Sequence, residues 1–196
     1  MFKRIFDIVG SLLGIIILIF ITPIIALAIL LEDGWPLFVS LERISDGRRV
    51  FIYKFRSMVK NAHAMKKSLS HLNERKDGPL FKIKNDPRLT RVGKVLRKLR
   101  LDEFPQFINV LLGNLSLVGP RPHEPEEIEA YPKEFKVLSS AKAGLTGLSQ
   151  VSGASALPFL KELELDKYYL EHQSFILDMQ ILGRTLWILF SDPTGV

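Results

Sequence analysis

The longest feature of the hydrophobic pattern is an uncharged segment near the amino terminus. Between Asp7 and Glu32 lie 24 uncharged residues, most of them Ile, Leu, Val and Phe. A straight α-helix of this length extends about 36 Å, more than the hydrocarbon thickness of a bilayer at roughly 30 Å. Its apolar core exceeds that of a secretory signal peptide, so we expect it to remain in the protein as a membrane element.

Thr22-Pro23 interrupts this segment late in its length. An interior proline removes a backbone hydrogen bond and bends a helix, and Thr22 can bond back to a freed carbonyl. The pattern therefore allows either a kinked spanning helix or a re-entrant helix that breaks here and leaves on the side it entered. Cations flank both ends and mildly favour two cytoplasmic ends, although Glu32 and Asp33 weaken that signal: Lys3, Arg4, Arg43, Arg48, Arg49, Lys54 and Arg56.

The following residues alternate between β-rich and polar patterns. Residues 34–58 predict a hairpin, because VFIYKF is rich in β-formers and Ser45-Asp46-Gly47 supplies a turn. The polar segment 59–77 predicts a surface helix. A turn at 85–87 precedes a predicted helix over 89–100.

The second half predicts further helices separated by loops. A helix is expected to begin near Asp102 and to stop at Gly113. A proline-stiffened loop (116–125), an acidic helix (124–138), a glycine-rich loop (144–154) and a helical region (159–190) follow. Residues 174–190 are strongly apolar and include Trp187, a residue suited to a membrane interface. They could meet lipid, the protein's own core or a second copy, so a homodimer is among the expectations.

These elements predict an α-rich α+β fold on a membrane. Residues 1–33 form the membrane helix in this interpretation, and residues 34–196 form one compact domain with a small β-hairpin and interfacial helices.

Composition and charge narrow the function. The absence of cysteine excludes a disulfide scaffold and a thiolate metal site, and the four histidines have no metal-binding spacing. Residues 1–100 hold 20 Lys/Arg against 8 Asp/Glu, which suits anionic lipid, a phosphorylated substrate or nucleic acid. No RNA-binding signature or zinc-finger spacing supports nucleic acid.

Asp102-Glu103 is the main candidate for chemistry. A carboxylate with a pKa near 4 is ionised at neutral pH, so it can attack phosphorus or bind Mg²⁺ without a base. Glu103 could act as second ligand or general base. The simpler interpretation is a helix cap, since Asp and Glu are common in first turns.

Cations near these carboxylates could bind phosphate. Eight cations and one acid lie from Lys82 to Arg100, and the cations fall on several helical faces. They could bind substrate phosphates, or they could instead attract the protein to anionic lipid headgroups. Pro120 and Pro122 stiffen the backbone on both sides of Arg121. Glycine-rich residues 144–151 offer amides to a phosphate. The candidate phosphate-binding residues are Lys54, Arg56, Arg88, Arg97, Arg100 and Arg121.

Three segments together resemble the bacterial sugar transferases called monotopic phosphoglycosyl transferases. They are KFRSM (54–58), NDPRLTRVGKVLRKLRLDEFPQFINVLLGNLSLVGPRP (85–122) and GLTGLSQVSG (144–153), and their order and spacing also match. The resemblance implies a re-entrant helix broken at Thr22-Pro23 in the inner membrane of a bacterium, with the catalytic domain on the cytoplasmic face.

The resemblance also implies a reaction. Asp102 would attack the β-phosphate of a UDP-sugar, release UMP and hold a phosphosugar until undecaprenyl phosphate accepts it. Mg²⁺ would sit by Asp102 and Glu103, and the family's functional basic positions would correspond to Lys54, Arg56, Arg97 and Arg121. Many relatives carry Asn-Gly-Arg where this chain has Ser152-Gly153-Ala154, which puts one nucleotide contact in doubt. Two alternatives stay open: a non-catalytic module that binds anionic lipid, and an enzyme that uses one ternary complex without a covalent step.

Overall fold

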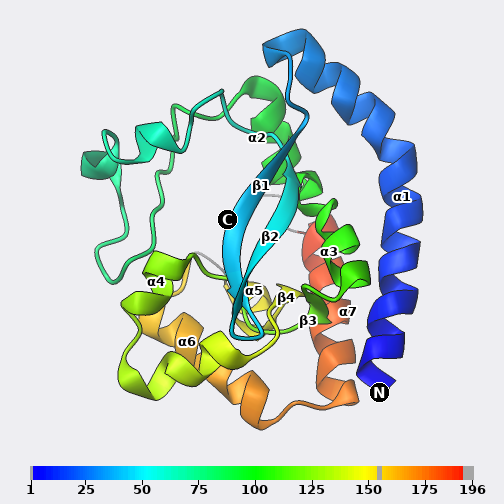
Figure 1. Ribbon diagram of the computed structural model, residues 1–196, viewed down its shortest axis with the longest axis vertical. Coiled ribbons are helices and arrows are strands. Elements are labelled where there is room, and N and C mark those ends of the chain that lie inside the picture. Colours follow the sequence, from blue (N-terminus) through cyan, green and yellow to red (C-terminus); the bar gives the residue numbers. More distant parts are fainter. Residues whose placement is uncertain (1, 154–155, 192–196) are drawn as a thin grey trace.

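The computed structural model describes residues 2–153 and 156–191. Its longest element is α1 (Phe2–Asp33), a helix of 32 residues. The helix continues through Pro23 and bends in its carboxyl-terminal part (Figure 1). The Thr22 hydroxyl donates to the Leu18 carbonyl at 2.6 Å, the back-bonding that the sequence predicts beside a proline. The helix therefore bends in this region without being interrupted.

The surface of α1 is reversed relative to a helix of a water-soluble protein. Its inward face carries small or polar residues beside a few aliphatic ones: Asp7, Ser11, Gly14, Leu18, Ile25 and Ile29. Its outward face is apolar and exposed. The helix is long and apolar enough to cross a membrane, with only 22% of its most apolar stretch buried inside the protein. Since this outward face is exposed among the described residues, the helix is suited to contact lipid.

The predicted hairpin is confirmed. Strands β1 (Phe38–Ser45) and β2 (Arg48–Phe55) pair antiparallel with Ser45 opposite Arg48. The two-residue turn Asp46-Gly47 has positive φ at both positions, 58° and 71°, as the tight hairpin turns that match strand twist require.

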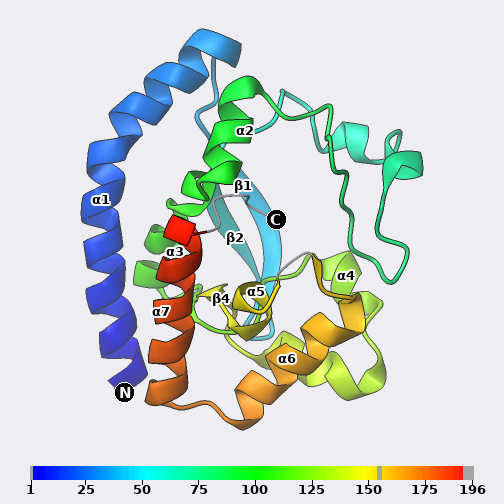
Figure 2. The same ribbon diagram turned by 180° about the vertical axis from the view of Figure 1, so that it is seen from behind.

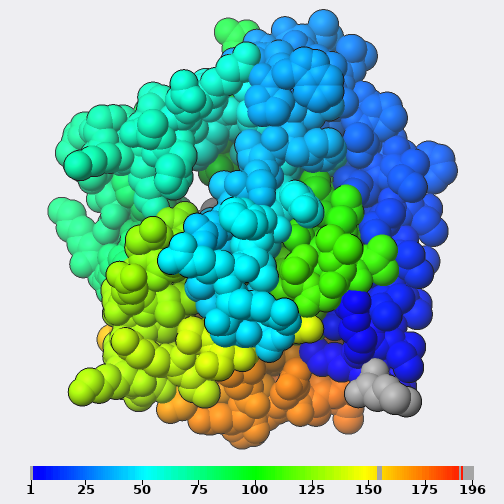
Figure 3. Space-filling model, viewed as in Figure 1, coloured from blue at the N-terminus to red at the C-terminus, as the bar shows by residue number. Residues whose placement is uncertain are grey.

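The predicted surface helix over 59–77 is wrong. This segment forms turns and two short 3₁₀ helices, η1 (Ala64–Lys66) and η2 (Ser70–Leu72), with no buried residue in either. A polar sequence without an apolar stripe has no packing face to stabilise a continuous helix. Figure 3 shows this segment as a lobe separated from the hairpin by an opening.

Three elements follow that build the candidate site. They are α2 (Arg91–Lys98), the 3₁₀ turn η3 (Leu101–Glu103) and α3 (Gln106–Leu112). Helix α2 lies within the predicted range 89–100. Helix α3 starts at Gln106, after Pro105, so the expectation that an α-helix begins at Asp102 is wrong by one turn. Gly113 ends α3 with φ of 84°, as predicted for a helix stop.

A small parallel sheet was missed by the sequence analysis. Strand β3 (Ser116–Val118) pairs with β4 (Gly144–Thr146), and α5 (Leu148–Val151) follows directly. Both strands lie in segments predicted as loops. They have only three residues each, too few to show an alternating pattern.

The remaining predicted helices are divided. The acidic segment splits into α4 (Pro125–Glu129) and η4 (Lys133–Ser140), because Pro132 cannot continue a helix. The region 159–190 splits into α6 (Phe159–Glu171) and α7 (Phe175–Ser191). Both views show α7 beside the amino-terminal half of α1 (Figures 1 and 2). There the ring centroid of Phe175 lies 5.2 Å from that of Phe2 and 5.5 Å from that of Phe6.

Three apolar clusters hold these elements together. One joins the hairpin to β3, α3, α6 and α7, and includes Ile52, Val110 and Leu115. A second packs α1 against Phe55 and Leu96. A third lies under η4 and α6. The fold is α-rich α+β, as predicted, and α1 packs along it as part of the core.

Candidate active site

Asp102 and Glu103 lie at the joint between two helices. Arg100, at the end of α2, has φ of 55° in the left-handed region, and its amide donates to the Arg97 carbonyl at 3.0 Å. This conformation reverses the chain, and the 3₁₀ turn η3 then presents both carboxylates before α3 begins. Asp102 and Glu103, here called the dyad, therefore belong to a tight turn that is fixed by helices on both sides.

Asp102 is buried, with 6% of its surface exposed. Burial raises the pKa of its carboxyl above the ordinary range, and Glu103 also raises it, while Lys54 and Arg97 lower it. This pKa differs from the ordinary value near 4 expected for an aspartate from its residue type. The correction follows from burial, which a residue type alone does not disclose.

Glu103 is the more accessible member, with 40% of its side chain exposed, and it forms an ion pair with Lys54 of β2. Burial of its carboxyl group raises its pKa, but Lys54, Arg121 and Arg100 more than offset this, so the pKa of Glu103 is lowered. The two neighbouring carboxyls thus have pKa values moved in opposite directions, a common property of functional sites.

Helix α2 brings Arg97 to the dyad through an unusually close contact. A Cβ on Gly93 would lie 1.8 Å from the Ser57 carbonyl oxygen, so only glycine permits this approach. Arg97 Nε donates to Ser57 Oγ at 3.1 Å. The Thr90 hydroxyl caps the helix by accepting from the Gly93 amide at 2.8 Å. Ser57 and Gly93 were not singled out from the sequence, although a glycine inside a predicted helix was a usable signal.

Arg121 reaches the dyad from the loop after β3. Its amide donates to Asp166 Oδ2 of α6 at 2.9 Å, and prolines flank it. Among the described residues, Lys54, Arg97, Arg100 and Arg121 are therefore cations that act on Asp102 or Glu103. They come from β2, α2, the joint after α2 and the loop after β3, so the fold gathers residues far apart in sequence.

Arg56 and Arg88, the two other predicted phosphate-binding residues, are buried in ion pairs. Arg56 is buried and pairs with Asp33, and its Nε donates to the Pro36 carbonyl at 2.6 Å. Arg88 is buried against Asp86, with Nη2 and Oδ2 2.6 Å apart. Both guanidinium groups are used in these contacts to hold neighbouring loops of the protein. A contact with substrate stays a prediction for Arg56 and Arg88.

The glycine-rich segment has a structural use. A Cβ on Gly144 would lie 2.1 Å from the Gly119 amide nitrogen, and one on Gly147 would lie 2.2 Å from the Gly119 carbonyl oxygen. The Gly119 amide donates to the Thr146 carbonyl at 2.9 Å and the Gly144 amide to the Pro120 carbonyl at 2.8 Å. These glycines let the backbone at Gly119 lie close against β4 and Gly147, and the Gly119 and Gly144 amides are both used in hydrogen bonds between the two segments. Within the predicted phosphate-binding residues 144–151, the Gly144 amide is therefore already used by a backbone carbonyl. For the other amides of this segment the role stays a prediction. Ala154, the position at which the family resemblance leads one to expect Arg, lies outside the described residues.

Asp166 provides a pH-dependent test of this arrangement. Burial raises the pKa of its carboxyl, and the Arg121 amide, Ser149, His123 and the Arg121 side chain only partly oppose this. A raised folded pKa gives stability that is present below about pH 4 and is lost as the pH rises through the folded pKa. Asp166→Asn keeps an acceptor for the Arg121 amide, so we expect its melting temperature to exceed that of wild type at pH 8.

The difference in melting temperature between Asp166→Asn and wild type should shrink as the pH falls toward 4. Thermal unfolding at a series of pH values measures this difference. Glu164→Gln is the matched control on α6, because its pair with Lys161 is exposed and contributes little. A difference between Asp166→Asn and wild type that is the same at every pH would contradict the linkage.

Comparison with known proteins places the sequence in a family. The sequence pattern of the bacterial sugar transferase family matches residues 1–192. The chain is 40% identical over 193 residues to a galactosyl transferase, CpsE, of Streptococcus agalactiae, covering 95% of this chain and 42% of that protein. It is 40% identical over 192 residues to an undecaprenyl-phosphate galactose phosphotransferase of Salmonella typhimurium, covering 93% and 39%.

A relative of similar length also matches. The exopolysaccharide production protein ExoY of Sinorhizobium fredii is 34% identical over 191 residues, covering 94% of this chain and 83% of that protein. The chain thus spans about two fifths of the length of the first two relatives and most of the third. All three similarities cover the described site.

Proposed function

Since the chain belongs to the bacterial sugar transferase family, we propose that it moves a sugar 1-phosphate from a UDP-sugar to undecaprenyl phosphate, an early membrane step of polysaccharide synthesis. The names of its relatives, a galactose phosphotransferase of undecaprenyl phosphate and an exopolysaccharide production protein, support this class of substrate and product. The observation that carries the proposal is a buried Asp102 that Lys54 and Arg97 influence electrostatically, with Glu103 beside it in sequence.

The reaction we propose has two displacements at phosphorus. An Asp102 carboxylate oxygen forms a bond to the β-phosphorus of the UDP-sugar, and the bond from that phosphorus to the bridging oxygen breaks, so UMP leaves. An oxygen of undecaprenyl phosphate then attacks the same phosphorus and frees the Asp102 carboxylate. One site thereby serves both substrates in turn, which suits a single cluster of cations.

The cations around the dyad would offset the charge of the phosphates. Lys54, Arg97, Arg100 and Arg121 already act electrostatically on the two carboxylates. A diphosphate brings further negative charge to this point, and fixed guanidinium groups stabilise it without reorganisation. Lys54 also fixes the Glu103 carboxylate through its ion pair.

The donor set of the dyad fits Mg²⁺ held jointly with substrate. Among residues 2–153 and 156–191, no group of three or more His, Cys, Asp or Glu could hold a metal alone. Mg²⁺ is commonly bound by one or two carboxylates together with substrate phosphates, and Asp102 and Glu103 would supply the carboxylates. A bound Mg²⁺ would supply positive charge that offsets the negative charge of the diphosphate and of the leaving group.

The contacts of α1 support a re-entrant arrangement. Lys3 pairs with Asp178 of α7 at 2.6 Å, and Asp33, at the other end of α1, pairs with Arg56 after β2. A helix of 32 residues is about 48 Å long, yet both ends contact one domain. We therefore place both ends and the domain formed by residues 34–196 on the cytoplasmic face of the inner membrane, with the Thr22-Pro23 bend in lipid.

Exposed apolar side chains on other helices would lie at the membrane interface. They are Val95 and Leu99 of α2 and its end, Ile108 and Leu112 of α3, and Leu186 and Trp187 of α7. Such surfaces are favourable at the boundary of headgroups and acyl chains. The same exposed face of α7 keeps a homodimer as a prediction.

Release of UMP tests the proposal directly. Purified protein in detergent, with Mg²⁺ and undecaprenyl phosphate, is expected to release UMP from at least one member of a panel of UDP-sugars. Omission of undecaprenyl phosphate should leave about one equivalent of UMP per active site, since the covalent step precedes the acceptor. A ternary-complex enzyme would release none without acceptor. A non-catalytic lipid-binding module would release none under either condition, although it would bind anionic liposomes in a salt-dependent manner.

A further inference from the structure

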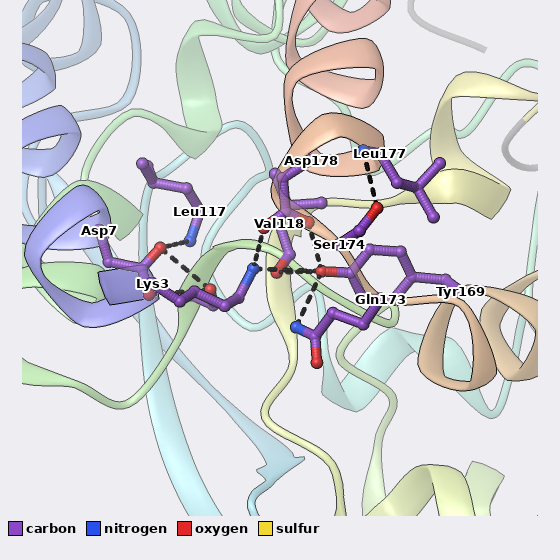
Figure 4. A network of polar contacts seen from close by, with 10 residues as sticks. Lys3, Asp7, Leu117, Val118, Tyr169, Gln173, Ser174, Leu177 and Asp178 are labelled. Atoms are coloured by element: carbon purple, nitrogen blue, oxygen red, sulfur yellow. Dashed lines mark hydrogen bonds and ion pairs between the residues drawn. The ribbon is translucent and has the colours of Figure 1, made fainter. Parts of the chain in front are cut away.

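All five charged residues of α1 bind the rest of the protein. Lys3 pairs with Asp178, and Asp33 pairs with Arg56. The Asp7 carboxylate accepts from the Leu117 amide at 2.9 Å and from the Ser116 hydroxyl at 2.9 and 3.0 Å. Figure 4 shows Lys3 and Asp7 turned from α1 toward β3, α6 and α7. A helix that only anchored the protein to lipid would not need a partner for every charge.

Two of these charges bind the ends of the segment that carries the dyad. Glu32 Oε1 and Oε2 accept from the amides of Arg91 and Val92 at 2.7 and 2.8 Å, at the start of α2. Arg4 donates from Nη1 to the Val110 carbonyl and from Nη2 to the Leu111 carbonyl, both at 2.6 Å, at the end of α3. The Arg91 and Val92 amides and the Leu111 carbonyl are backbone groups that a helix cannot satisfy internally at its termini. The Val110 carbonyl also accepts from the Gly113 amide at 3.0 Å.

Charge at these ends is also of the favourable sign. A carboxylate lies at the amino terminus of α2 and a guanidinium at the carboxyl terminus of α3, opposite to the partial charges of each helix end. Between them, α2, η3 and α3 form the continuous stretch 91–112 with Asp102 and Glu103 in its middle. The bend of α1 lies between Arg4 and Glu32 (Figure 1).

We propose that α1 acts as a splint for the active site, with Glu32 and Arg4 as positioning residues that fix the two ends of the 91–112 segment. The helix thereby sets where Arg97 and Asp102 stand relative to each other. This inference rests on the proposed function and adds to it, because it assigns a catalytic effect to residues of the membrane helix that do not touch substrate.

Packing along α1 supports the splint. A Cβ on Gly14 would lie 2.5 Å from the ring of Phe107 in α3, and one on Gly10 would lie 2.5 Å from Leu117 Cδ1. The Ser11 side chain between them is fully buried. Helix α1 is thus in close contact with α3 at Gly14 and with β3 at Gly10, and it binds both ends of the 91–112 segment through Glu32 and Arg4.

The test uses the full chain in detergent and two variants with their controls. Glu32→Ala and Arg4→Met are each expected to lower kcat by about 10- to 100-fold, since small misplacement of reacting groups has effects of this size. KM for the UDP-sugar should change by less than about threefold, because neither residue touches substrate. Arg4→Lys keeps a donor for one carbonyl and should recover part of the loss. Glu164→Ala and Arg48→Met remove exposed charges and serve as controls.

Hydrogen exchange separates positioning from general loss of stability. In both variants, amides of residues 91–112 should exchange faster, while those of β1 and β2 keep the wild-type rate. Unchanged kcat in folded Glu32→Ala and Arg4→Met, or equally faster exchange across the whole domain, would overturn the splint. Absence of UMP release by wild type would instead refute the proposed function.

Discussion

Asp102→Asn is expected to abolish the covalent phosphosugar adduct and to lower UMP release by at least about 10³-fold, the scale on which loss of a covalent nucleophile acts. The amide has the same shape as the carboxyl but cannot attack phosphorus. Intact-protein mass spectrometry after incubation with UDP-sugar and Mg²⁺, without acceptor, measures the adduct. Wild type should gain the mass of one phosphosugar on Asp102, and the variant should gain none.

The same substitution should not weaken the fold. Burial raises the pKa of Asp102 in the folded state. Keeping this carboxyl ionised at neutral pH therefore lowers the stability of the wild type, and the neutral amide of Asp102→Asn removes that cost. Without added Mg²⁺ at pH 7.5, we expect the variant to melt at or above the wild-type temperature. A helix-capping role alone would leave activity unchanged in this variant.

Asp46→Asn is the matched control for this substitution. Asp46 is exposed in the hairpin turn at φ 58°, a conformation that Asn adopts readily. It should retain wild-type adduct formation. Wild-type turnover in Asp102→Asn would remove Asp102 as nucleophile.

The sequence was informative about the fold where one pattern dominated. The apolar run of α1, the turn Asp46-Gly47 and the stop at Gly113 each depend on local chemistry, and the structure agrees with them. The helix expected over 59–77 failed because helix propensity without an apolar face gains nothing from packing. The strands β3 and β4 were not recognised because three residues carry too little pattern, and their pairing joins residues far apart in sequence.

The candidate site was predictable in its residue types but not in its geometry. Asp102, Glu103 and their motif could be identified from the sequence, and Lys54, Arg97, Arg100 and Arg121 do act on them in the fold. The burial of Asp102 could not be predicted, since it depends on how α2 and β2 pack around the turn. Arg56 and Arg88 show the converse limit, because a cation in a basic motif can equally stabilise a loop.

The contact between Gly93 and Ser57 joins the packing of α2 to the chemistry of the dyad. It lets α2 lie directly on the backbone after β2, and this brings Arg97 within hydrogen-bonding distance of Ser57 and near Asp102. A larger residue at position 93 must push the whole helix away, since the atom it meets is a backbone oxygen that no side-chain rotation can move.

Gly93→Ala is therefore expected to lower the free energy of unfolding by about 3 kcal/mol, at the upper end of the usual cost of overpacking. For a chain of this size, that corresponds to a fall in Tm of roughly 10 °C. Gly183→Ala is the matched control, because Gly183 also lies inside a helix, α7, but a Cβ there meets nothing within 4 Å. Alanine favours helix over glycine, so this control should be neutral or gain up to about 1 kcal/mol.

At a temperature where Gly93→Ala is still folded, its adduct formation should be slower than that of Gly183→Ala, because Arg97 moves with the helix. Equal melting temperatures and equal adduct rates in the two variants would show that α2 does not depend on this close approach.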